Sequence, residues 1–158
     1  MFRRCFKAPK FSSSGLTLVE LLIVIGIIGI LAGGLVTLLN PSQQINKAND
    51  GRRRGDLVKI QAALELYRGD LGSYPLSLPA CNAPLTSGGA APKTYLERTP
   101  CDPTRTGWYN GSRYYYTSNG STYTLIACLA NSRDTNGTAG QPPGGGCATN
   151  RYYQAVNP

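Results

Sequence analysis

The chain has 158 residues, and its 16 lysines and arginines outnumber its 8 aspartates and glutamates, which gives a formal charge of +8. A chain of this length predicts one folded domain. The sequence contains no histidine, which excludes the Ser–His–Asp and Cys–His nucleophiles. Paired catalytic carboxylates and a phosphate-binding loop are not evident either. We therefore do not expect an enzyme.

Residues 1–15 form a basic leader that ends in the small residues Ser12 to Gly15. The leader carries the cations Arg3, Arg4, Lys7 and Lys10, without any acid among them. Without these cations the chain is only mildly basic, so its charge is weak support for a nucleic-acid partner.

Residues 16–39 are mostly apolar, and Glu20 is the one charged residue among them. A helix of this length extends roughly 36 Å, enough to cross a bilayer core of about 30 Å. The basic leader should stay on the cytoplasmic side. An ordinary signal peptide has its small-residue site after the apolar run, whereas here that site precedes it. The sequence thus predicts a single-pass membrane helix whose C-terminal side faces outward.

Residues 40–72 predict an amphipathic continuation of this helix. Pro41 disfavours helix at Asn40, so we expect a kink or a short break there. Beyond it, one apolar stripe recurs at spacings of three and four, formed by Leu57, Ile60, Leu64, Tyr67 and Leu71. That spacing is typical of a helix with one buried face. The basic run at 52–54 lies mostly off the stripe and is expected either to be a solvated face or to pair with acids such as Glu65 or Asp70 of neighbours.

Residues 73–158 predict a β-rich head. Residues 76–107 are interpreted as irregular, with a short helix near Tyr95-Leu96. Two strand-like runs, 113–117 and 122–128, flank Asn119-Gly120, which is a strong hairpin signal. A last strand is expected over 151–156. The fold class is therefore α+β, with a long N-terminal helix packed on a small antiparallel sheet whose loops are stapled by disulfides.

The head contains four cysteines, while Cys5 lies in the leader. An export signal together with spaced cysteines indicates an oxidising compartment. Four cysteines allow three connectivities. We favour the local pairs Cys81–Cys101 and Cys128–Cys147, and a staple from Cys101 to Cys147 is the alternative. No two cysteines form a C-x-x-C pair, so a zinc site is not predicted.

The stretch from Gly15 to Ile25 is the most informative about function. A carboxylate inside an apolar segment costs roughly 2.5–3.5 kcal/mol on insertion scales, so something should compensate for Glu20. Cleavage after Gly15 would leave a free amine on Leu16, which is a cation near neutral pH. Glu20 would be its counter-charge, in the same subunit or in the next. Because a buried unpaired carboxylate is costly, Glu20 could set the axial offset between neighbours.

Gly15 through Leu31 resembles the class III signal of type IV pilins and their relatives, the type II secretion pseudopilins and competence pilins. The resemblance implies that a prepilin peptidase cuts after Gly15 and methylates the new N-terminus. Leu16 departs from the family, which usually has Phe there; since a bulky apolar residue is kept, we expect processing to survive.

The resemblance also implies a structural subunit, and apart from a weak calcium candidate we expect no cofactor. Its partners would be copies of itself, minor pilins, the peptidase and an inner-membrane assembly platform, while nucleic acid is a weaker candidate. The subunit would be a single-pass membrane protein before assembly and part of an extracellular filament afterwards. Helices would form the filament core, with the heads outside.

Three functional hypotheses follow. The first is a type IV pilus subunit acting in adhesion, motility or DNA uptake. The alternative is a pseudopilin of a type II secretion system, whose shafts usually carry few disulfides and often a calcium loop, so the four head cysteines favour the pilus. The second alternative is a membrane-anchored binding protein that never polymerises.

The major pseudopilin of this family binds calcium in a loop after its hairpin. At about that place this chain has the oxygen-bearing side chains Asn131, Asp134 and Asn136. Calcium sites usually gather several carboxylates, and here there is one. An ordinary Asx-type turn is the favoured interpretation.

Overall fold

A computed structural model of the chain describes residues 15–104, 114–144 and 146–157, without the side chains of residues 35–39. The chain divides into two compact units, of which the first ends at Asn40 and the second begins at Pro41.

Helix α1 (Leu18–Leu39) is the only regular element described in the first unit. It begins after Thr17, whose Oγ1 accepts a hydrogen bond from the backbone N–H of Glu20 at 3.2 Å. This N-cap satisfies one of the backbone donors that a helix start leaves unpaired. The helix ends at Asn40, which has left-handed backbone angles (φ 42°). Across the residues whose side chains are described, no helix is both long and apolar enough to cross a membrane.

Helix α2 (Pro41–Leu71) opens the second unit. Proline suits the first position of a helix, because its missing N–H would have no partner there. The break predicted at Asn40-Pro41 coincides with the junction of the two helices. At the other end, Gly72 takes a positive φ of 77° and its N–H donates to the Arg68 carbonyl at 2.7 Å. A residue with a Cβ would be strained in that position.

All strands pair antiparallel, in two small sheets. Strand β1 (Leu85–Thr86) pairs with β2 (Thr94–Leu96). The larger sheet has the order β3-β4-β6-β5, from β3 (Tyr115–Ser118), β4 (Tyr123–Cys128), β5 (Thr138–Ala139) and β6 (Arg151–Val156). Strand β4 is central, and its residues pair with both β3 and β6.

Strands β3, β4 and β6 are close to the predictions, whereas β5 was not predicted, and β1 and β2 lie in the stretch 76–107 that was interpreted as irregular with a short helix near Tyr95-Leu96. The short helix predicted there is wrong, because these residues form β2 and Leu96 lies opposite Leu85 of β1. The predicted hairpin is present: β3 and β4 are joined at Asn119-Gly120, where Gly120 has a φ of 87°.

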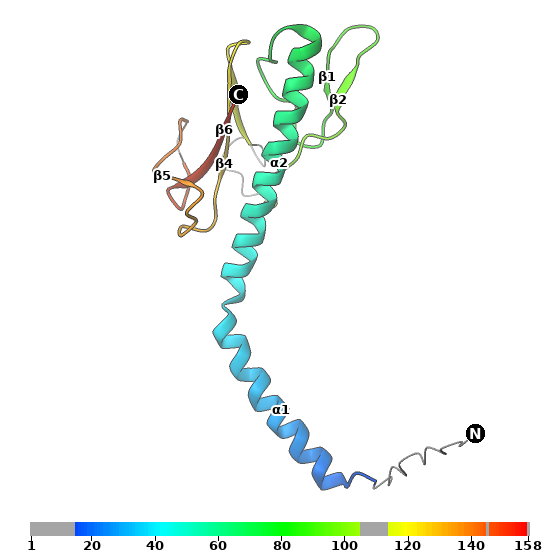
Figure 1. Ribbon diagram of the computed structural model, residues 1–158, viewed down its shortest axis with the longest axis vertical. Coiled ribbons are helices and arrows are strands. Elements are labelled where there is room, and N and C mark those ends of the chain that lie inside the picture. Colours follow the sequence, from blue (N-terminus) through cyan, green and yellow to red (C-terminus); the bar gives the residue numbers. More distant parts are fainter. Residues whose placement is uncertain (1–14, 105–113, 145, 158) are drawn as a thin grey trace, which may run out of the picture. The chain divides into compact units, whose positions relative to one another are not determined.

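The core of the second unit lies between α2 and the larger sheet, and Figure 1 shows β4 and β6 beside this helix. Leu57, Ile60 and Leu64 of the predicted stripe are fully buried. Tyr67 packs partly against the core, whereas Leu71 is 45% exposed, so the stripe ends one turn earlier than predicted. The side chains that meet α2 are mostly aromatic or aliphatic: Tyr74, Leu85, Tyr114, Tyr123, Leu125, Ala127 and Ala155.

The fold class is α+β, as predicted. Two disulfides bridge Cys81 to Cys101 and Cys128 to Cys147, which are the two local pairs favoured from the sequence. Each closes a loop of about 20 residues that is irregular apart from the short strands β1, β2 and β5, and a small core stabilises such segments least.

Candidate assembly site

The start of α1 carries the residues predicted for processing and assembly. Gly15, Leu16 and Glu20 are all exposed, with Glu20 in the first helical turn. A negative charge there interacts favourably with the positive end of the helix dipole. Among the described residues, the Glu20 carboxylate has no ion-pair partner. Its charge is therefore available to a group outside the described part of the chain.

Helix α1 exposes apolar side chains on all of its faces. Leu16, just before the helix, and Leu18 and Ile30 within it are between 68% and 79% exposed, and the other apolar side chains up to Leu31 are between 44% and 65% exposed. The exposed set is Leu16, Leu18, Val19, Leu21, Leu22, Ile23, Val24, Ile25, Ile27, Ile28, Ile30 and Leu31. Covering a side chain of this size contributes roughly 1.5–3 kcal/mol. A surface this apolar needs a cover that one described chain does not provide.

The glycines of α1 are not explained by packing within one chain. A Cβ added at Gly26 or Gly29 would meet nothing within 4 Å in the described structure. Glycine in a helix interior costs about 0.5–1 kcal/mol relative to alanine. Small residues of this kind let two helices approach closely.

The basic run at 52–54 is not one solvated face: two of its three arginines pair with acids, but with acids of the same chain rather than with Glu65 or Asp70 of neighbours. Arg52 is exposed, but Arg53 is 5% exposed and lies between two carboxylates. Its Nη1 donates to Asp50 Oδ1 at 2.7 Å, and its Nε donates to Asp102 Oδ2 at 2.7 Å. Arg54 pairs with Asp134. Because two of the three guanidinium groups are engaged internally, the run offers little to a phosphate backbone.

The buried acids of α2 were missed from the sequence. Asp50 is 1% exposed and accepts the N–H groups of Ala130 and Asn131, both at 2.8 Å. Asp56 is 5% exposed and accepts the Tyr114 hydroxyl at 2.9 Å. Burial first, then the Asp56 charge, raises the pKa of Tyr114. The missed signal was spacing: positions 50 and 53 continue the three-and-four repeat of the apolar stripe.

The predicted calcium candidates lie in the loop after β4. Asp134 Oδ1 accepts the N–H of Asn136 at 2.9 Å, and Asn131 Oδ1 accepts the N–H of Arg133 at 3.2 Å. These are the short-range contacts of Asx-type turns. In the described part of the chain, no group of three or more acidic, histidine or cysteine side chains could hold a metal ion.

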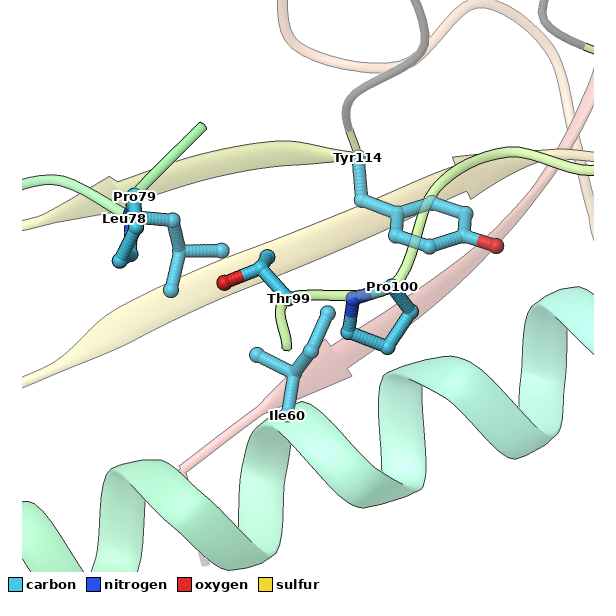
Figure 2. A pocket seen from close by; sticks show the side chains of 6 residues that line it. All are labelled: Ile60, Leu78, Pro79, Thr99, Pro100 and Tyr114. Atoms are coloured by element: carbon cyan, nitrogen blue, oxygen red, sulfur yellow. The ribbon is translucent and has the colours of Figure 1, made fainter. Parts of the chain in front are cut away.

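A small pocket lies where the β1–β2 side of the head meets α2. It is lined by Ile60, Leu78, Pro79, Thr99, Pro100 and Tyr114. Figure 2 shows Ile60 rising from the helix toward Thr99 and Pro100, with Tyr114 beside them. The space left between these side chains is about 10 Å³, room for about one water molecule. A substrate of ordinary size, which needs about 300 Å³ or more, does not fit there.

Comparisons with known proteins point to the start of the chain and to most of its length. Residues 10–36 match the prokaryotic N-terminal methylation motif. The chain is 34% identical over 101 residues to the type II secretion system core protein G of Aeromonas hydrophila, covering 60% of this chain and 69% of that protein. It is 34% identical over 110 residues to core protein G of Pseudomonas aeruginosa, covering 64% and 72%.

A pilin is similar over a shorter stretch. The toxin coregulated pilin of Vibrio cholerae is 43% identical over 84 residues, which cover 50% of this chain and 35% of that protein. No solved structure gives a significant match.

Proposed function

Because this chain belongs to the family of type IV pilins and type II secretion pseudopilins, we propose that it is a structural subunit of a type II secretion pseudopilus. The sequence alone favoured a pilus because of the head cysteines. The core protein G relatives favour the pseudopilin alternative, since the likeness covers more than two thirds of their length, against 35% of the pilin.

The observation that carries this proposal is the apolar surface of α1. Exposed apolar side chains surround the helix from Leu18 to Leu31. In the assembled filament, the α1 helices of neighbouring copies cover one another and exclude water from these side chains. Before assembly, the same segment anchors the precursor in the cytoplasmic membrane.

Glu20 sets the register of the α1 helices. The prepilin peptidase cuts after Gly15 and creates an α-amine on Leu16, whose ordinary pKa of about 8 leaves it mostly protonated at neutral pH. Burying Glu20 among apolar helices without a partner would be costly. Only those axial offsets are stable that bring the Leu16 amine of one copy to Glu20 of the same or a neighbouring copy.

The second unit contributes the outer surface of the filament. Its covalent staples and buried ion pairs keep the head folded in an oxidising compartment. Minor subunits of the same family and the inner-membrane assembly platform are the partners of this surface and of α1.

A strain lacking the chain tests the proposal. We expect its type II secreted enzymes to stay in the cell, measured as activity in the medium, while surface pili seen by electron microscopy persist. Restoring the wild-type chain should restore secretion, and N-terminal sequencing of the mature protein should begin at Leu16. Glu20→Gln should process normally but fail to restore secretion, because the register contact is lost.

Glu97→Gln is the matched control, since it makes the same change at an exposed head position and should restore secretion fully. Lost pili with intact secretion would support the second candidate, a type IV pilus subunit, which the likeness to the toxin coregulated pilin favours. A mature protein that still starts at Met1 would refute both.

A further inference from the structure

The loop between β4 and β5 gathers oxygen atoms of the kind that bind calcium. It presents the Asp134 carboxylate, the Asn131 side-chain carbonyl, and the backbone carbonyls of Asp134 and Gly137. Carboxylate and carbonyl oxygens are the ligands that calcium takes, six to eight at a time. The family resemblance places a calcium ion at about this point.

Arginines already occupy these oxygens. Arg54 of α2 donates from Nη2 to Asp134 Oδ2. Arg151 of β6 donates from Nη1 to the Asp134 carbonyl at 2.7 Å and to the Gly137 carbonyl at 3.1 Å. The second carboxylate oxygen of Asp134 accepts the Asn136 N–H. The loop's only carboxylate and two of its carbonyls are therefore engaged by guanidinium groups or by the backbone.

The other carboxylate that the described residues bring to this loop is already engaged. Asp50, which accepts two N–H groups of the same loop, also accepts a hydrogen bond from Arg53 and is fully buried. A divalent cation placed beside Asp134 would lie close to two positive side chains and be repelled by both. The residues present do not fit a calcium ion.

Arg54 is held beside Asp134 by more than one contact. Its side chain is 27% exposed and that of Asp134 is 13% exposed, so the pair is screened by water less than a surface pair would be. The guanidinium also lies over the ring of Tyr153, 5.8 Å from the centroid, which is a cation–π distance. Its Nε is buried without a hydrogen-bond partner among the described residues, so the contacts with Asp134 and Tyr153 are the ones that orient the group there.

We infer that Arg54 and Arg151 take the place of a calcium ion in holding the loop 129–137 on α2 and β6, so that the fold of the head does not depend on calcium. Arg54 comes from α2 and Arg151 comes from β6. Each brings a positive charge to the loop 129–137 and so connects its own element to that loop. The arrangement belongs to the head itself, so it holds for a pilus subunit and for a pseudopilus subunit alike.

The wild-type protein gives the first test. The processed full chain in detergent micelles is melted by circular dichroism in EDTA and in millimolar calcium chloride, and calcium chloride is titrated into it by calorimetry. We expect the same midpoint in both buffers and no saturable heat. A midpoint raised by calcium by several degrees, or stoichiometric calcium binding, would overturn the inference without touching the proposed function.

Variants of the arginine give the second test. Arg54→Gln should accelerate amide hydrogen exchange in residues 130–137 by about tenfold or more, as expected for a lost charge-assisted hydrogen bond, and calcium should not reverse this. Arg52→Gln is the control, because Arg52 is an exposed neighbour on the same helix, and its exchange should match wild type. Equal exchange in the two variants would contradict the inference.

Asp134→Asn covers the case in which the arginine variant does not fold. It keeps the size of the side chain and the turn contacts but weakens the ion pair, so the same amides should exchange faster. If amide hydrogen exchange in residues 130–137 is unchanged in this variant, the inference is wrong.

Discussion

Arg53 and Asp102 lie 49 residues apart in the sequence and form a two-point contact, in which Nε donates to Oδ2 at 2.7 Å and Nη2 donates to Oδ1 at 2.9 Å. The contact fixes the loop that follows Cys101 to α2. Thr104 completes it, because its backbone N–H donates to Asp102 Oδ1 at 2.9 Å. Planar, bidentate pairs of this kind combine strength with a defined geometry.

Replacing Arg53 with methionine should destabilise the head strongly. The change leaves Asp50 and Asp102 buried without their counter-charge, and breaking a buried ion pair from one side costs about 3–5 kcal/mol. Urea unfolding of the processed chain, followed by far-ultraviolet circular dichroism, measures this loss. Arg53→Lys should lose less stability than Arg53→Met, because lysine keeps the positive charge but cannot make the two-point contact of a guanidinium group. Arg52→Met, at an exposed position, should unfold like wild type, and equal losses at 52 and 53 would contradict the assignment.

The same contact predicts a loss of stability in acid. Burial by itself would raise the pKa of Asp102, but the hydrogen bonds from Arg53 and Thr104 outweigh it and hold that pKa below its ordinary value of 3.8. The unfolded chain therefore takes up this proton at a higher pH than the folded chain does. The stabilisation is present above about pH 4 and is lost as the pH falls through the lower folded-state pKa.

Asp102→Asn checks this pH dependence. The variant should be less stable than wild type at pH 6, but its urea midpoint should fall less between pH 6 and pH 3, because the titrating carboxyl is gone. Glu97→Gln removes an exposed acid and should keep the wild-type slope. If Asp102→Asn also keeps that slope, then another group is responsible for the acid sensitivity.

The helices and the strands β3, β4 and β6 could be predicted because their signals are local. Pro41 and Gly72 mark the bounds of α2, and Asn119-Gly120 marks the hairpin. The spacing of Leu57, Ile60 and Leu64 predicts the buried face, and all three are fully buried. Periodicity needs only neighbouring residues, so one sequence is enough to read it.

The charged part of the core could not be predicted because it depends on distant partners. Arg53 is favourable in the core only because Asp102 meets it there, and Asp50 only because the loop at Ala130 and Asn131 supplies two N–H groups. Asp50 and these backbone donors are 80 and 81 residues apart. Strand β2 was missed for another reason: it has only 3 residues, too few to show an alternating pattern, although its partner β1 is close in the sequence.

Gly137 is required by packing rather than by its backbone angles. A Cβ there would collide with the side chain of Leu129, which is buried, and would lie 3.3 Å from the Tyr152 carbonyl. Gly137→Ala should therefore cost about 1–3 kcal/mol, the usual effect of overpacking. In Gly55→Ala the new Cβ meets nothing within 4 Å, and this variant should gain about 0.5–1 kcal/mol from helix propensity. The urea midpoints of the two variants should move in opposite directions. If Gly137→Ala leaves the urea midpoint unchanged, then Leu129 repacks freely around the new Cβ.

The Cys81–Cys101 disulfide and the Arg53–Asp102 contact should be energetically coupled, because Asp102 directly follows Cys101. Removing the disulfide by Cys81→Ala with Cys101→Ala costs about 3 kcal/mol in the chain-entropy model. In that variant the Arg53 contact must itself order the freed loop, so adding Arg53→Met should cost less than it does in wild type. We expect the combined loss to fall short of the sum by about 0.5–3 kcal/mol in a double-mutant cycle. A Cβ at Gly55 meets nothing within 4 Å, so Gly55→Ala is the control. Its effect on the free energy of unfolding should be the same with and without the disulfide. If the free-energy losses from Arg53→Met and from disulfide removal are strictly additive, then the disulfide and the ion pair hold the loop independently.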